Sequence, residues 1–170
     1  LGKKGRPVRV GKLESFIAQF DADMHLTHER LPEKTRGKVA VIGSGPAGLT
    51  VAGDLARQGF HVTIFEGQQE LGGVLMYGIP EYRLPKAVVR NEIKKIEALG
   101  VNFVTNCLVG SPESGVTVDS LFADGFDAIF MGTGTALPQN LNVPGSDLRR
   151  VTQSTDFLHN VNAYIEGVLP

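Results

Sequence analysis

Runs of β-forming residues alternate along this chain with stretches in which apolar residues recur at helical spacing. The predicted strands are 39–42, 61–65, 101–104 and 128–131, with a weaker, short one at 116–118. A helix follows the first strand from Pro46, and another is predicted over Lys86–Leu99, where Gly100 ends it. This alternation of strands and helices predicts an α/β fold built on a parallel sheet.

Both ends of the chain carry helical patterns outside this core. An amphipathic helix is predicted near the start, with an apolar stripe that needs a partner surface. The stripe has the spacing i, i+3, i+4, i+7 and consists of Leu13, Phe16, Ile17 and Phe20. Residues 21–37 are polar, residues 138–150 are loop-like, and Asp156–Ile165 is a predicted helix. The expected parts are a helical connector at 1–37, a main domain at 38–150 and a second connector at 151–170.

The composition of the 170 residues limits the kinds of protein this can be. With 42% hydrophobic residues, the chain can fill a core. The net charge of −1 gives no reason to expect nucleic acid or a membrane surface as a partner, and no apolar run approaches the roughly 20 residues that span a bilayer. The single cysteine, Cys107, excludes an internal disulfide, a C-x-x-C pair and a four-cysteine cluster built from this chain alone. We therefore expect a cytoplasmic protein.

Four smaller features each have a structural and a functional interpretation. Residues 1–12 hold five basic residues and no acidic one, which favours a solvated arm over a segment that binds an anionic partner. His25 and His28 have a spacing that permits a shared metal on a helix, but a solvated pair is favoured. Cys107 is expected to be a small buried hydrophobe rather than a reactive thiol. Lys86 is expected to be a surface lysine at a helix start rather than a group at a cofactor edge.

The most informative stretch is a glycine-rich turn between the first strand and its helix. Residues 43–48 read G-S-G-P-A-G, the G-x-G-x-x-G pattern of dinucleotide-binding βαβ units. Gly43 allows the tight turn, Gly45 lets the backbone approach a pyrophosphate, and Gly48 lets the helix pack closely against the strand. Pro46 suits the first helical turn, whose N–H groups can face an anion. Strand, turn, helix and second strand together favour a nucleotide site over an ordinary glycine turn.

The second strand is followed by an acidic residue, Glu66, which lies 23 residues after Gly43. Its carboxylate can accept hydrogen bonds from both hydroxyls of an adenosine ribose. A 2′-phosphate in that place would meet a like charge, at a cost of about 1 kcal/mol in water and about 4 kcal/mol near a protein surface. The site is therefore predicted to prefer FAD or NAD over NADP.

Several motifs of the chain resemble those of one flavoprotein family. They are Val41–Gly48, Phe65–Glu66, Leu71–Leu75 and, most restrictive of all, Tyr77–Lys86, which reads Y-G-I-P-E-Y-R-L-P-K. The segment 132–134 also resembles the strand-end A-T-G of flavoproteins with two dinucleotide domains. The family they resemble is that of the small (beta) subunit of bacterial glutamate synthase. Its relatives include the N-terminal part of dihydropyrimidine dehydrogenase and the larger subunit of electron-bifurcating ferredoxin–NADP oxidoreductase.

This resemblance implies FAD as the cofactor, held by a Rossmann-like FAD-binding domain. In such proteins the glycine turn holds the pyrophosphate, a second glycine loop lines the path to the flavin, Arg83 contacts the cofactor and Val109 reaches the adenine through its backbone. The implied cofactor-binding residues are Gly43, Ser44, Gly45, Pro46, Ala47, Glu66, Gly67, Gly73, Val74, Arg83, Val109, Thr133 and Gly134. The structural alternatives are an ordinary ion pair of Arg83 with Glu81 or another surface acid, and a plain tight turn at 132–134.

The resemblance also implies that the chain is a fragment of an NAD(P)H-dependent oxidoreductase. Family members carry [4Fe-4S] clusters before a segment like residues 1–5, and an NAD(P)H-binding unit and the last strand of the FAD domain after the position of Pro170. Electrons would pass between nicotinamide, flavin and clusters, with another redox subunit or domain as partner and no catalytic acid or base in this chain. The alternative is a non-catalytic FAD-binding or docking module. A free-standing NAD-dependent dehydrogenase domain is disfavoured by Leu71–Gly73 and the Y-G-I-P string.

Overall fold

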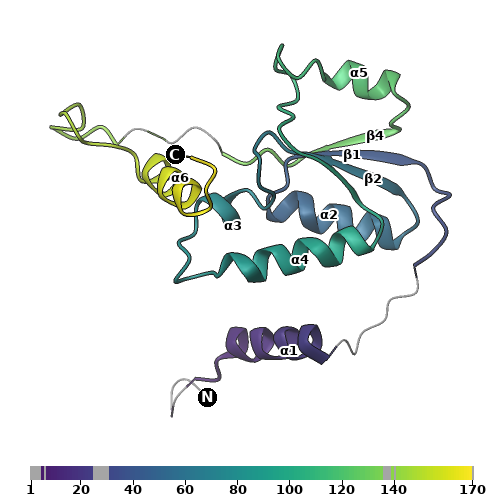
Figure 1. Ribbon diagram of the computed structural model, residues 1–170, viewed down its shortest axis with the longest axis horizontal. Helices are drawn as coiled ribbons and strands as arrows, with labels where there is room; N and C mark the ends of the chain where they lie inside the picture. Colours follow the sequence, from purple (N-terminus) through teal and green to yellow (C-terminus); the bar gives the residue numbers. More distant parts are fainter. Residues whose placement is uncertain (1–4, 6, 25–30, 136–138, 140, 170) are drawn as a thin grey trace. The chain divides into compact units, whose positions relative to one another are not determined.

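The computed structural model describes residues 5, 7–24, 31–135, 139 and 141–169, and the chain divides into two compact units that meet in sequence between Leu31 and Pro32. The N-terminal unit contains α1 (Val10–Met24; Figure 1), which confirms the predicted amphipathic helix and extends it beyond Phe20. The residues of its apolar stripe are exposed, and the rings of Phe16 and Phe20 stack 6.3 Å apart. His25 and His28 lie outside the described residues.

The second unit is built on a four-stranded parallel sheet, as the sequence predicts. Its strands are β1 (Lys38–Ile42), β2 (His61–Phe65), β3 (Asn102–Val104) and β4 (Ala128–Met131). The strand order is β3-β2-β1-β4, so the chain moves outward from β1 in one direction and then returns to its other side. Ile42 is opposite both Phe65 and Met131. The carboxyl ends of the three neighbouring strands are therefore level with one another.

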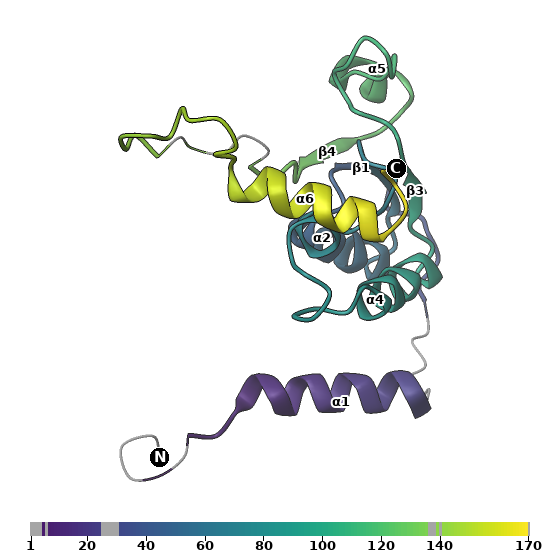
Figure 2. The same cartoon turned by 60° about the vertical axis from the view of Figure 1, so that its left-hand side comes forward.

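Helices cover the two faces of this sheet unequally (Figures 1 and 2). On one face, α2 (Pro46–Arg57) and α4 (Lys86–Ala98) form the larger core with strand residues such as Val62 and Ile64. The core positions of α2 include Ala52 and Ala56, whose small side chains let the helix lie close to the sheet. The other face carries α5 (Val118–Ala123) and a smaller core, made of Ala40, Ile42, Phe65, Cys107 and Leu121.

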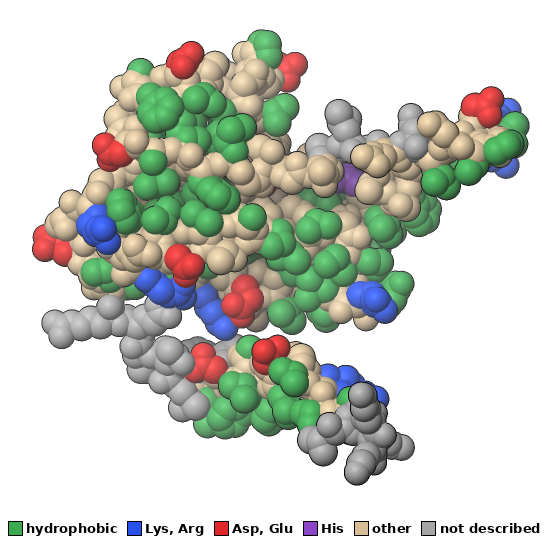
Figure 3. All heavy atoms as spheres, turned by 180° about the vertical axis from the view of Figure 1, so that it is seen from behind, with side chains coloured by type: hydrophobic (Ala, Val, Ile, Leu, Met, Phe, Trp, Pro, Cys, Tyr) green, Lys and Arg blue, Asp and Glu red, His purple; other side chains and the backbone are tan. Residues whose placement is uncertain are grey.

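The prediction of a strand at 116–118 is wrong, because this segment starts α5. The hydroxyl of Thr117 accepts a hydrogen bond from Ser120 N (3.0 Å), and Thr117 N donates to the Ser120 hydroxyl (2.9 Å). This reciprocal capping box starts a helix at Val118, so local hydrogen bonds override the β preference of Val and Thr. Around α5, the exposed apolar residues include Leu108, Val118 and Phe122, and hydrophobic side chains gather on this part of the surface (Figure 3).

Two further helices complete the unit. The predicted C-terminal helix is α6 (Ser154–Ile165), and it packs against α3 (Val74–Tyr77), a single turn that the sequence pattern did not predict. Among the described residues, no helix combines the length and the apolar character needed to cross a membrane. The same residues contain no group of three or more His, Cys, Asp or Glu side chains arranged to hold a metal ion.

Candidate functional site

The glycine turn after β1 is fixed by contacts within the protein at two of its three glycines. Gly43 has a φ of +97°, and a Cβ there would lie 2.5 Å from the carbonyl oxygen of Gly132. A Cβ on Gly48 would lie 2.0 Å from the carbonyl oxygen of Gly43. Both distances are to backbone atoms, which cannot move aside as a flexible side chain can. The fold itself therefore requires glycine at these two positions.

Gly45 differs, because no contact among the described residues requires glycine there. Its φ of −66° suits any residue, and none of their atoms would lie within 4 Å of a Cβ. Gly45 is the N-cap of α2, whose first hydrogen bond runs from Leu49 N to Gly45 O (3.0 Å). The N–H groups of Gly45, Ala47 and Gly48 come before that bond and lie at the positive end of the helix dipole. The turn thus combines open space with donors suited to an anion.

The loop after β4 lies beside this turn. Gly132 N donates to Ile42 O (2.8 Å), and a Cβ on Gly43 would lie 3.3 Å from Thr133 Cα. Gly134 follows with a φ of +70°, and no atom of the described residues lies within 4 Å of its Cβ position. The strand order β3-β2-β1-β4 reverses between β1 and β4, so this is the topological switch point of the sheet. Open α/β sheets bind ligands in the crevice at that place.

Glu66 and Ser44 form a buried polar pair next to the turn. Glu66 is 7% exposed and Ser44 is fully buried. The Oε2 atom of Glu66 accepts hydrogen bonds from Ser44 N (2.8 Å) and from the Ser44 hydroxyl (2.6 Å), and Oε1 accepts one from Gln68 N (2.9 Å). A carboxylate offers about four lone-pair sites, so the chain itself uses three of them. About one site is left free, whereas Glu66 would need two to bind both ribose hydroxyls by itself.

The Ser44 hydroxyl extends this pair to the second glycine loop, since it also accepts a hydrogen bond from Gly72 N (2.9 Å). In that loop a Cβ on Gly73 would lie 3.0 Å from Gly45 Cα, so the two glycine loops touch. Gly73 is also the N-cap of α3, which places Val74 at the first position of that helix. The structure therefore brings the turn, Glu66, Gly73 and the start of α3 together.

Gly67 and Val109 lie on the side of Glu66 that faces the loop after β3. Glu66 N donates to Val104 O (2.8 Å), and Cys107 N donates to Glu66 O (2.8 Å). A Cβ on Gly67 would lie 3.2 Å from the Leu108 side chain, and Val109 packs half-buried on the smaller core. Cys107 is buried, as expected, and burial raises the pKa of its thiol.

Arg83 lies on the exposed loop before α4. Within the described residues its guanidinium makes no ion pair, so the structural alternative, an ordinary ion pair with Glu81 or another surface acid, does not form there. Glu81 instead accepts a hydrogen bond at Oε2 from Lys86 N (2.9 Å), at the start of α4. Nor does a hydrogen bond among the described residues join Arg83 to the glycine turn. Its contact with a cofactor therefore remains a prediction.

The expectation that Lys86 is a surface lysine is wrong, because its residue is only 2% exposed. Its ammonium donates to the carbonyl oxygens of Leu75 (2.9 Å) and Ile79. Burial is the main cause that lowers the pKa of Lys86 below its ordinary value. A lysine at the start of an amphipathic helix gives no sequence signal for burial, so the pattern could not reveal this role.

Tyr77 links α3 to α6, a contact that sequence analysis also missed. Its ring stacks on His159 with 4.8 Å between centroids, and its carbonyl oxygen accepts a hydrogen bond from Asn162 Nδ2 (2.7 Å). Its hydroxyl accepts one from Glu70 N (2.9 Å), and burial raises the pKa of this phenol.

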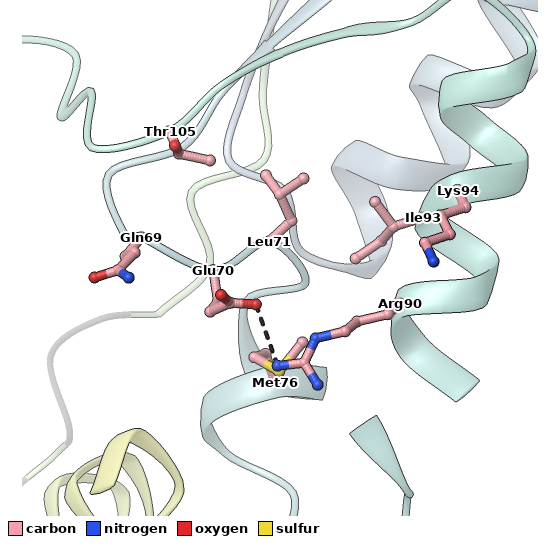
Figure 4. Close-up of a pocket in the computed structure, with 8 residues that line it drawn as sticks. All are labelled: Gln69, Glu70, Leu71, Met76, Arg90, Ile93, Lys94 and Thr105. Atoms are coloured by element: carbon pink, nitrogen blue, oxygen red, sulfur yellow. Dashed lines mark hydrogen bonds and ion pairs between the residues drawn. The ribbon is translucent and has the colours of Figure 1, made fainter. Parts of the chain in front are cut away.

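A cavity of about 270 Å³ lies on the α4 side of the second glycine loop (Figure 4). Its lining residues are Gln69, Glu70, Leu71, Met76, Arg90, Ile93, Lys94 and Thr105. Arg90 pairs with Glu70 across it (3.4 Å) and also with Glu166 of α6. None of the predicted cofactor-binding residues lines this cavity, so it is distinct from the candidate site at the glycine turn.

Curated relatives of the chain are oxidoreductase subunits. It is 41% identical to the small chain of NADPH glutamate synthase from Bacillus subtilis, covering 89% of this chain and 30% of that protein. It is 38% identical to the PreT subunit of NAD-dependent dihydropyrimidine dehydrogenase from Salmonella typhimurium, covering 78% and 32%. It is 47% identical to the beta subunit of NADP(+)-dependent formate dehydrogenase from Moorella thermoacetica, covering 85% and 20%. The chain thus spans about a third or less of the length of these relatives.

Among solved structures, FprA of Mycobacterium tuberculosis in complex with NADPH matches with a TM-score of 0.66 and 25% identity, over 76% of this chain and 30% of that one. The relatives confirm the predicted resemblance to the glutamate synthase small subunit and the oxidoreductase class. The fold match and the parallel sheet confirm a Rossmann-like α/β domain. Since residues 37–170 match the family model, the chain belongs to the pyridine nucleotide-disulphide oxidoreductase family.

Proposed function

We propose that this chain is the FAD-binding part of an NAD(P)H-dependent flavoprotein oxidoreductase. The observation that carries this proposal concerns Gly45. Its φ suits any residue, and no atom of the described residues lies near its Cβ position, so neither explains why this residue is glycine. A ligand that packs directly on the backbone supplies the missing reason, because a Cβ would occupy the place of its pyrophosphate. The donors at the start of α2 suit the charge of that group.

The remaining predicted residues fit an extended dinucleotide on either side of this point. On the adenosine side, Glu66 has about one acceptor site left for a ribose hydroxyl, with Gly67 and Val109 next to it. On the flavin side, Gly73 and Thr133 lie beside the turn. Val74 and Gly134 follow them in the sequence, and Arg83 offers a permanent cation. When bound, FAD supplies hydride and single-electron chemistry. The residues of this chain bind and orient it.

The proposal extends to the whole protein through the names of the relatives. NADPH glutamate synthase small chain and the dihydropyrimidine dehydrogenase and formate dehydrogenase subunits are parts of redox enzymes. We infer that this protein likewise passes electrons between NAD(P)H, flavin and [4Fe-4S] clusters, with the nicotinamide and cluster sites outside this chain and another redox subunit or domain as partner. The assignment of 1–37 and 151–170 as connectors and a cytoplasmic location belong to this proposal.

The Gly45→Ala variant of the intact protein tests the proposal directly. The added methyl group enters empty space, so the melting temperature is expected to change by only a few degrees, whereas FAD affinity falls at least about tenfold. Gly11→Ala is the matched control, since a Cβ there also meets nothing within 4 Å, and it is expected to keep wild-type FAD binding. The readouts are flavin absorbance and titration calorimetry.

The same preparation distinguishes the possible outcomes. Intact protein that remains colourless with FAD in excess would contradict the proposal. Bound flavin that neither NADH nor NADPH reduces would leave the non-catalytic module as the function. Unchanged FAD affinity in Gly45→Ala would show that the pyrophosphate does not lie on this turn.

A further inference from the structure

Four polar or charged residues are buried among the described residues, and they form two groups around the second glycine loop. Ser44 and Glu66 belong to the candidate cofactor site. Lys86 and Asn162, each 2% exposed, both donate hydrogen bonds to backbone carbonyls of the short segment that starts with α3. Burial of polar groups is costly unless they are paired. Lys86 and Asn162 are both paired with this segment, so together they fix its position in the fold.

Lys86 and Asn162 hold the carbonyl end of α3. The Lys86 ammonium donates to Leu75 O and Ile79 O, and the Asn162 amide donates to Tyr77 O. Leu75 O and Tyr77 O are carbonyls that a helix of one turn leaves without an internal partner, and Ile79 O lies just after the helix. A cation is favourable at this end of a helix, which offsets part of the cost of burying the ammonium.

The opposite end of α3 touches the glycine turn. Gly73 is its N-cap, with Met76 N and Tyr77 N donating to Gly73 O (3.0 and 2.9 Å). A Cβ on Gly73 would lie 3.0 Å from Gly45 Cα. A displacement of α3 along its axis would therefore move Gly73 relative to the pyrophosphate turn.

Lys86 also makes hydrogen bonds at two places along the segment that carries Arg83. Its ammonium binds Ile79 O before the loop, and its backbone N–H binds Glu81 within the loop (2.9 Å). Arg83 N and Leu84 N both donate to Pro80 O (2.9 and 3.1 Å), which closes the turn between these anchors. One buried side chain thus joins α3 and the loop of Arg83.

We propose that Lys86 is a positioning residue for the cofactor: it fixes α3 and the loop of Arg83 relative to the glycine turn, without touching the cofactor itself. This inference rests on the proposed FAD-binding function. It goes beyond that function by assigning part of the affinity to a buried ammonium on the far side of α3.

The test uses Lys86→Met in the intact protein, because methionine fills a similar volume without the charge. We expect the Kd for FAD to rise about tenfold or more and amide hydrogen exchange to accelerate at Val74–Ile79. The effect on Kd should be non-additive with that of Arg83→Gln, because both variants act on the same loop. The control Lys95→Met, an exposed lysine on α4 that pairs with Glu92 (2.8 Å), should change none of these readouts.

Each outcome decides something different. An Lys86→Met variant with slower folding or lower melting temperature but unchanged Kd, or with effects additive to Arg83→Gln, overturns the positioning role and leaves the FAD proposal intact. Wild-type protein that binds no FAD overturns both. If Lys86→Met does not fold, Lys86→Gln serves instead, since a shorter neutral amide cannot hold Leu75 O and Ile79 O as the ammonium does; unchanged exchange and Kd in that variant overturn the role.

Discussion

The hydroxyl of Ser44 donates to Glu66 Oε2 over 2.6 Å and accepts from Gly72 N over 2.9 Å. One buried side chain therefore joins the acidic end of β2 to the second glycine loop. Residues that are expected to hold the adenosine and those expected to lie near the flavin are connected through a single oxygen atom.

Ser44→Ala is expected to destabilise the protein. It removes the hydroxyl and leaves Gly72 N without its acceptor in a buried place, which costs about 1–3 kcal/mol of unfolding free energy. Urea unfolding of the wild type and the variant measures this difference. Ser146→Ala, at an exposed serine, should unfold like the wild type. Equal stabilities for Ser44→Ala and the wild type would contradict the hydrogen-bonded link.

Glu66→Ala is expected to weaken FAD binding and the fold together. A hydrogen bond between a ribose hydroxyl and a charged group is worth about 1.5–3 kcal/mol, which calorimetric titration can resolve. The variant also leaves Ser44 N and Gln68 N without acceptors, so its melting temperature should fall. Glu97→Ala, at an exposed acid on α4, provides the control. Unchanged FAD affinity in Glu66→Ala would refute its role in binding.

Gly48→Ala is expected to lower the free energy of unfolding and Gly53→Ala to raise it, although both glycines lie in α2. A Cβ on Gly48 would lie 2.0 Å from a backbone oxygen, so the helix must move, at a cost of about 1–3 kcal/mol. A Cβ on Gly53 first meets Arg57 Nη1 at 3.2 Å, on a flexible side chain. There alanine should stabilise the helix by up to ~1 kcal/mol. Thermal unfolding of the two variants compares them, and equal effects would contradict the close packing of the turn.

Tyr77→Phe is expected to change how stability depends on pH. Burial raises the pKa of Tyr77 above its ordinary value of 10, so the wild type has the full benefit of the neutral phenol below pH 10 and loses it as the pH rises through the raised pKa. Phenylalanine does not titrate. It leaves Glu70 N without its acceptor, which lowers the free energy of unfolding by about 1 kcal/mol.

The advantage of the wild type over Tyr77→Phe should therefore be constant from neutral pH to about pH 9 and shrink above pH 10. Chemical unfolding across this range measures it. Tyr164→Phe, at a tyrosine that is 67% exposed, should show no such change. An advantage that stays constant to pH 11 would contradict the assigned burial effect.

The sequence predicted the parts of the molecule that depend on local pattern. The central strands and the turn of 43–48 follow from apolar runs and from glycines that the backbone requires, as Gly43 and Gly48 confirm. Thr117 shows the limit of β propensity, because its capping bonds with Ser120 start a helix instead. Lys86 and Asn162 could not be predicted, since their burial depends on carbonyls of α3 that only tertiary packing brings near.

The bond from Asn162 to Tyr77 O joins residues 85 positions apart in the chain. During synthesis, β1, α2 and β2 can therefore assemble long before the support of α3 has emerged from the ribosome, because distant contacts form last. A nascent chain that stops before α6 would contain the glycine turn of residues 43–48, but α3 beside it would lack the hydrogen bond from Asn162. The hydrogen bond that supports α3 is therefore expected to form late in the maturation of this protein.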